Sequence, residues 1–169
     1  MELVARQVLK DCETALEVLR ENPKSPRWRV SWVATVALLR MVGHALQKVD
    51  AGSDPKLKRI VEDHWKRISA SKPEPNIFWD FIDRERNNVL KEYDVGARLN
   101  VTVRPGTVHI DMESGTQSVV SQSRPNLYDY VMGPGPFEGQ DQRELVSEAI
   151  GFWDDYLGEI EREYEAANG

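Results

Sequence analysis

The residues with the clearest chemical potential lie in one predicted helix, residues 77–93. On a helical wheel of about 100° per residue, the large side chains of this segment gather on one face: Phe78, Phe81, Ile82, Val89 and Tyr93. Glu85 and Arg86 project within about 50° of the centre of that face. Because burying an unpaired charge costs several kcal/mol, both side chains need partners or must line a cleft. Two interpretations stay open: a structural ion pair, for example with Arg40, or a charged cleft.

The run Arg86-Asn87-Asn88-Val89-Leu90-Lys91-Glu92-Tyr93 resembles the signature of HEPN domains. In that superfamily an Arg, often followed by Asn, precedes a His a few residues further on, sometimes with a Tyr after the His. Here Arg86, Asn87 and Tyr93 fall at the matching positions, and Lys91 stands where the family has His. The resemblance extends over roughly residues 1–93. It implies a helical bundle that often forms homodimers whose motifs face one another.

Active HEPN proteins are metal-independent ribonucleases of toxin–antitoxin, phage-defence and RNA-processing systems, in which the His serves in proton transfer from the RNA 2′-hydroxyl. A neutral imidazole accepts a proton near pH 7, whereas an exposed ammonium group holds its proton at that pH. The wheel also places Lys91 about 140° from Arg86, towards the polar side. The resemblance therefore implies a degenerate, non-catalytic member, in which Arg86 binds a phosphate or holds a dimer together.

Arg40 and His44 form a second candidate site. They are four residues apart in a predicted apolar helix and share a face, so they meet Glu85 and Arg86 if the two helices pack together. The candidates for catalysis are therefore Arg86, Lys91 and Glu85, and the candidates for binding are Arg86, Asn87, Tyr93, Arg40 and His44.

The other histidines do not extend this site. His64 is expected on a solvated helix face and His109 on the outer face of a strand. Because no two histidines have ligand spacing with carboxylates, we predict neither a metal site nor a cofactor.

Apolar periodicity and capping residues define the helices that position these side chains. The predicted helices are 2–21, 27–50, 55–69, 77–93 and a long C-terminal helix within 139–167. Asp54 before Pro55 is typical of a helix start, Asn76 is expected to cap the next helix, and Asp141 with Glu144 three residues later is typical of a capping box.

Between the last two helices, the segment 96–132 alternates apolar and polar residues and predicts half-buried strands. The strands around Val101 and Val108 are expected to pair as a β-hairpin across the turn at residues 104–107. A third strand is expected near Val119 or near residues 127–131.

The predicted fold is therefore one mainly α domain, residues 1–169. A four- to five-helix bundle (1–93) carries a small antiparallel hairpin or three-stranded sheet (96–132) before the long C-terminal helix (139–167).

The composition of the chain limits which kinds of partner the protein can bind. The net charge of −6 and the pI of about 5.2 argue against non-specific binding of nucleic acid, so RNA or a nucleotide requires a local basic site. The single cysteine, Cys12, fits a reducing compartment, and no apolar run is long enough for a membrane span, so we expect a cytoplasmic protein. Apolar surface on the second and fourth helices favours a homodimer.

Three functional hypotheses remain. The first is a non-catalytic HEPN-like module of bacterial defence or stress physiology that binds a partner protein or a nucleotide. The second is a toxin-type ribonuclease that uses Arg86. The third is a structural or interaction protein without a ligand site, in which Glu85 and Arg86 only specify packing.

Overall fold

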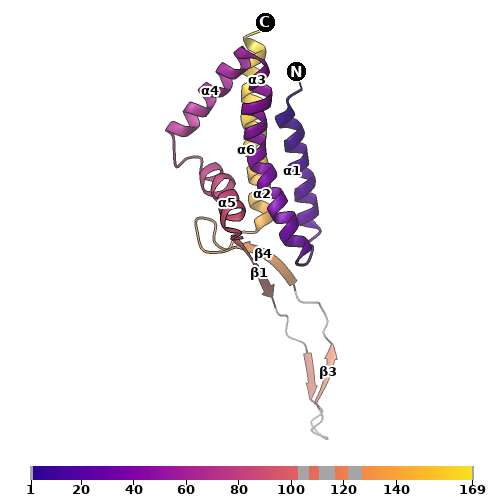
Figure 1. Cartoon of the computed structure of the whole chain (residues 1–169). Coiled ribbons are helices and arrows are strands. Elements are labelled where there is room, and N and C mark those ends of the chain that lie inside the picture. The colour runs from indigo at the N-terminus through magenta and orange to yellow at the C-terminus, as the bar shows by residue number, and fades with distance from the viewer. Residues whose placement is uncertain (1, 103–106, 111–116, 122–126, 169) are drawn as a thin grey trace.

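The computed structural model describes residues 2–102, 107–110, 117–121 and 127–168. It is mainly helical, with a small antiparallel sheet before the long C-terminal helix (Figure 1), and this confirms the predicted fold class. The helices are α1 (Val4–Arg20), α2 (Arg27–Ala45), α3 (Ala51–Ser53), α4 (Pro55–Ala70), α5 (Arg84–Asn87) and α6 (Gln142–Ala166). The strands are β1 (Ala97–Thr102), β2 (Thr107–Ile110), β3 (Gln117–Ser121) and β4 (Leu127–Met132).

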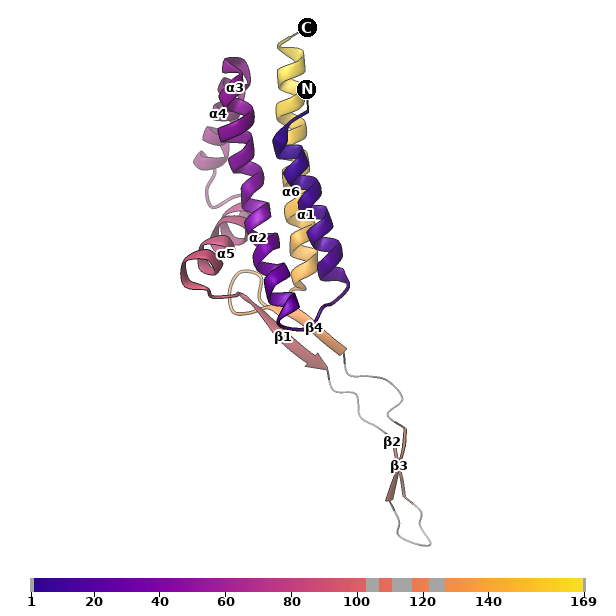
Figure 2. The same ribbon diagram turned by 45° about the vertical axis from the view of Figure 1, so that its right-hand side comes forward.

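Helices α1, α2 and α6 run side by side and enclose the core (Figures 1 and 2). Trp32 and Leu39 of α2 and Leu157 of α6 are fully buried in it. The close approach of α2 to α6 requires Gly43, because a Cβ at that position would lie 2.8 Å from the ring of Trp153. Cys12 of α1 is also buried, and desolvation raises the pKa of its thiol to about 12, which keeps it protonated and unreactive.

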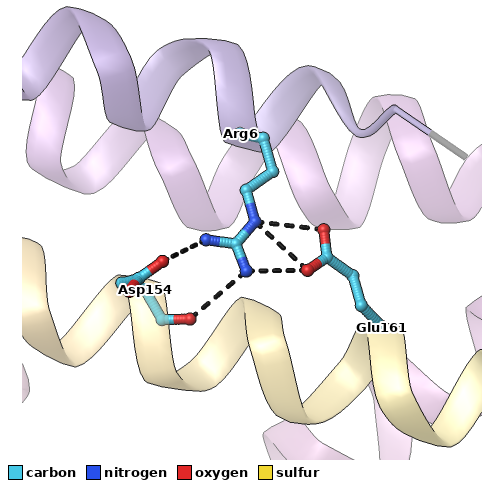
Figure 3. A network of polar contacts seen from close by, with 3 residues as sticks. All are labelled: Arg6, Asp154 and Glu161. Atoms are coloured by element: carbon cyan, nitrogen blue, oxygen red, sulfur yellow. Dashed lines mark hydrogen bonds and ion pairs between the residues drawn. The ribbon is translucent and has the colours of Figure 1, made fainter.

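An arginine joins the first helix to the last (Figure 3). Arg6 of α1 donates from Nε to Glu161 Oε1 at 3.0 Å and from Nη2 to Glu161 Oε2 at 2.7 Å. It also pairs with the carboxylate of Asp154, which precedes Glu161 on α6. A bidentate guanidinium contact fixes direction as well as distance, so this network sets how α1 lies along α6.

The N-terminus of α1 is capped from a distant part of the chain. Leu3 at the N-cap position has no side chain that accepts a hydrogen bond. Instead, the buried Asp50 accepts from Val4 N at 2.8 Å and from Ala5 N at 3.0 Å, one with each carboxylate oxygen. A carboxylate at a helix N-terminus satisfies free N–H groups and interacts favourably with the helix dipole.

Replacing Asp50 with alanine is therefore expected to lower the free energy of unfolding by about 2 kcal/mol, since two amides lose their acceptor. The loss in free energy of unfolding is measured by urea denaturation, with circular dichroism as the signal. Asp50→Asn keeps one acceptor oxygen and should lose about half as much. Equal stability of Asp50→Ala and the wild type would contradict this capping role.

The strand pairing differs from the predicted hairpin. β1 pairs with β4 in antiparallel register from Ala97↔Met132 to Thr102↔Leu127, and β2 pairs with β3. The prediction that β1 and β2 form a hairpin across residues 104–107 is therefore wrong, and residues 104–106 lie outside the described residues. Both expected positions for a third strand, near Val119 and at 127–131, are strands. In Figures 1 and 2 the β2–β3 pair extends away from the helices.

The predicted caps at Asp54 and Asp141 are confirmed, but within the described residues Glu144 returns no side-chain hydrogen bond to Asp141, so the capping box is only half formed. Asp54 accepts from Lys56 N and Leu57 N at the start of α4, and Asp141 accepts from Arg143 N at the start of α6. Asn76 makes no side-chain cap, so that prediction is wrong. The segment that follows Asn76 is a π-helical stretch, Ile77–Asp83 (η2), followed by α5 and a second π-helical stretch, Asn88–Glu92 (η3).

His64 is buried, which corrects the expectation of a solvated residue. Its Nε2 lies 2.8 Å from Glu163 Oε2 of α6, and its ring meets Tyr156 edge-on with 5.7 Å between the ring centroids. α4 thus turns its histidine towards α6, where a carboxylate satisfies the buried ring nitrogen. This residue is a packing contact between two helices.

Candidate functional site

The two charged residues at the centre of the 77–93 segment point to different places. Glu85 is 4% exposed, and its Oε1 accepts from Trp32 Nε1 at 3.1 Å and from Gly96 N at 2.8 Å. Burial raises the pKa of this carboxyl, although both hydrogen bonds act in the opposite direction. Glu85 therefore ties α2 and the residue before β1 to α5. Arg40, the example partner of the ion-pair interpretation, pairs with Asp83 instead.

Arg86 lies on the surface that α5 shares with α2. Its Nη1 donates to Asn87 Oδ1 at 2.9 Å, and Asn87 Nδ2 donates in turn to Asp83 Oδ2 at 3.4 Å. Asp83 Oδ1 accepts from Arg40 Nε of α2 at 3.2 Å. We call these residues, together with His44, the Arg86 cluster.

The Arg86 cluster carries more positive than negative charge. Asp83 is the carboxylate that pairs with Arg40, whereas among the described residues Arg86 forms no ion pair and has only the neutral Asn87 as acceptor. Arg86 is half-buried, so its remaining N–H groups face partly desolvated surroundings. A guanidinium in this condition is suited to an oxyanion such as phosphate.

His44 lies at the exposed side of the same cluster, on α2, whose opposite face packs in the core. Desolvation lowers the pKa of its imidazole, and the positive charges of Arg40, Arg86 and Lys48 lower it further, while Asp83 raises it. The imidazole is therefore neutral at pH 7 and can donate or accept a hydrogen bond there.

The structure brings together most of the predicted binding residues and separates the rest. Arg40, His44, Arg86 and Asn87 form one cluster, as the second candidate site required, but Glu85 belongs to the packed interior. Lys91 and Tyr93 are exposed near the end of η3, and within the described ranges neither forms a hydrogen bond or an ion pair with the cluster. Tyr93 has a φ of 55°, which ends the helical segment.

Sequence reasoning missed Asp83, which connects Arg40 to Asn87. Its spacing from Asn87, four residues along a helix, is a signal that could have suggested it. It also missed Trp32 as the partner of Glu85, because an indole N–H among apolar neighbours looks like a core residue until its partner is known.

Two further properties of the described residues concern metal binding and membrane insertion. His, Cys, Asp and Glu side chains in the described ranges do not gather in a group of three or more that could hold a metal ion. Over the same part of the chain, no helix has the length and apolar character needed to cross a bilayer.

Comparison of the chain with models of protein families, with curated proteins and with solved structures gave no match.

Proposed function

We propose that this protein is a non-catalytic HEPN-like module that holds a phosphate group of a nucleotide or RNA with the Arg86 cluster. The observation that carries the proposal is the environment of Arg86, a half-buried guanidinium whose acceptor is a neutral amide. Arg40 and the neutral His44 stand beside it and supply further donors. The motif-like order Arg86-Asn87 supports the same assignment, and Lys91 at the His position supports a module that binds without cleaving.

Binding of short single-stranded RNA of mixed sequence tests the proposal. We expect saturable binding by fluorescence anisotropy at low salt, and a loss of at least about tenfold in affinity for Arg86→Gln, because a charge-assisted contact to phosphate is removed. Arg59→Gln on the exposed side of α4 is the matched control and should bind as the wild type does. Binding that is insensitive to Arg86→Gln, with unfolding midpoints unchanged, would contradict the proposal.

A ribonuclease is the second candidate function, and the lowered pKa of His44 favours it. A neutral imidazole next to a guanidinium can accept the 2′-hydroxyl proton, the role that Lys91 cannot fill. In the same assay, RNA cleavage that persists in EDTA and is lost in both Arg86→Gln and His44→Gln would select the ribonuclease. RNA that is bound and stays intact supports the binding module. Strong destabilisation by Arg86→Gln without any RNA binding would favour a purely structural role.

A homodimer is part of the proposal, because one side of α2 carries an uncovered stripe with heptad spacing. Val30, Ala34, Ala37 and Met41 lie along it and His44 follows in the same row. Val30 is 68% exposed and Met41 is 48% exposed, and the two alanines between them allow close approach of a second helix. Parallel pairing of two copies along this stripe would place the two Arg86 clusters near each other, because the cluster lies at the C-terminal end of the stripe.

Met41→Glu is expected to shift the protein from dimer to monomer, weakening association by at least about tenfold, since the stripe would then bury a charge. Sedimentation equilibrium measures the association constant. Val4→Glu places the same charge on an exposed position of α1, outside the stripe, and should leave association unchanged. A monomeric wild type at all accessible concentrations would contradict the dimer.

A further inference from the structure

A cavity with a volume of about 200 Å³ lies between α5, the start of β1 and the loop 133–137. None of the residues of the Arg86 cluster lines it. An inference about this cavity therefore goes beyond the proposed function and does not depend on it.

Glu85 forms the inner wall of this cavity. The side chain is 96% buried, as its relative exposure of 4% shows, and Oε1 takes both hydrogen bonds, from Trp32 Nε1 and Gly96 N. Among the described residues, Oε2 has no hydrogen-bond donor. Oε2 is not one of the fully buried polar atoms that lack a partner, so this oxygen keeps contact with solvent at the cavity wall. The oxygen is therefore available to a donor that enters the cavity.

The outer wall carries charges of both signs. Arg84, Arg98, Asp80 and Asp94 line the cavity, and within the described residues none of the four forms an ion pair. The two guanidinium groups present planar forks of donors that match a carboxylate.

One of these guanidinium groups, that of Arg98, lies beside the loop 133–137. Gly133 N donates to Gly96 O at 2.7 Å, so the loop is joined directly to the strand that carries Arg98. A Cβ at Gly133 would lie 2.9 Å from Arg98 Nε, which shows that this side chain lies against the loop backbone. The cavity thus has an exposed cationic group at its rim, beside the loop, and a buried, hydrogen-bonded carboxyl group at its base.

We propose that this cavity binds a small zwitterion that carries a primary ammonium group and a carboxylate, such as a free α-amino acid. The ammonium group donates to Glu85 Oε2, and the carboxylate accepts from Arg84 and Arg98. The volume restricts the ligand to a small molecule, because drug-sized ligands need cavities of roughly 300 Å³ or more.

The test is a titration followed by ¹H–¹⁵N NMR of the Trp32 Nε1–H and Gly96 N–H signals, which report directly on Glu85. The probes are glycine, L-alanine and L-serine up to about 10 mM, with ethylamine and propionate as single-charge controls. We expect saturable shifts of both signals with at least one amino acid, and affinities at least about tenfold weaker for the amine and the acid alone.

Two variants complete the test. Arg98→Gln, at an exposed position, and Glu85→Gln, which keeps an acceptor for Trp32 and Gly96, should each weaken amino-acid binding by at least about tenfold. Arg59→Gln is the control and should leave it unchanged. The absence of saturable shifts, equal binding of ethylamine or propionate, or binding unaffected by Arg98→Gln would each overturn the proposal. RNA binding by the Arg86 cluster is measured separately, so either proposal can fail while the other stands.

Discussion

Replacing Gly96 with alanine is expected to lower the free energy of unfolding by about 2–3 kcal/mol. A Cβ at this position would overlap Glu85 Oε2 and lie 3.0 Å from Glu85 Cδ, a clash that a folded protein does not tolerate. Glu85 cannot move away easily, because it is buried and held by Trp32 as well as by the Gly96 amide. Relief of the clash must break one of these hydrogen bonds or shift β1 away from α5.

Guanidinium chloride unfolding of Gly96→Ala and of a matched glycine variant measures this effect. Gly151 lies inside α6, and a Cβ added there would have nothing within 4 Å, so Gly151→Ala should raise the free energy of unfolding by about 0.5–1 kcal/mol. If Gly96→Ala were as stable as the wild type, the close approach of Glu85 to the β1 backbone could not be correct.

Trp32→Phe is the second variant with a large expected effect, again a loss of about 2–3 kcal/mol. Trp32 is fully buried, so the smaller ring leaves a cavity, and the carboxylate of Glu85 loses its indole donor while remaining in the interior. A double-mutant cycle with Glu85→Gln separates the two contributions, since the electrostatic part should shrink when residue 85 is neutral.

The loss in Trp32→Phe should also depend on pH. Burial raises the pKa of Glu85 in the folded state, so the protonated form is favoured there, and the stability that this group contributes falls as the pH rises from the ordinary value of a Glu through the raised value. The Trp32 hydrogen bond opposes this rise. Its removal should therefore make Trp32→Phe relatively less stable at neutral than at mildly acidic pH, and an equal loss at both would contradict the assignment.

Much of the helical architecture follows from local signals. The apolar periodicity of α1, α2, α4 and α6, with the caps at Asp54 and Asp141, depends on residues a few positions apart, and it predicts these elements within a few residues. The cap of α1 by Asp50 joins residues 45 and 46 apart, and the β1–β4 pairing closes over two further strands. Alternation identifies strands but does not choose their partners, which is why the nearest turn predicts the wrong hairpin.

In the candidate site, too, local signals predict some features, and contacts between distant residues decide the others. The helical wheel correctly identifies Glu85 and Arg86 as charged residues that need an explanation. Neighbouring residues on a helix diverge by about 100°, so Glu85 can enter the core while Arg86 meets α2. The wheel cannot choose between them, because the choice depends on Trp32, Asp83 and Gly96, which lie on other turns and elements. The π-helical stretches on both sides of α5 also change the angular spacing that a regular wheel assumes.

The most direct test of the central claim is an NMR titration with a nucleoside monophosphate that follows the Arg86 Nε–H and the His44 ring signals. If the Arg86 cluster holds a phosphate, both signals should shift saturably with a common dissociation constant, and Arg86→Gln should abolish the shift at His44. If neither signal moves while the protein stays folded, or if the shifts fall elsewhere on the molecule, the Arg86 cluster is not a phosphate site.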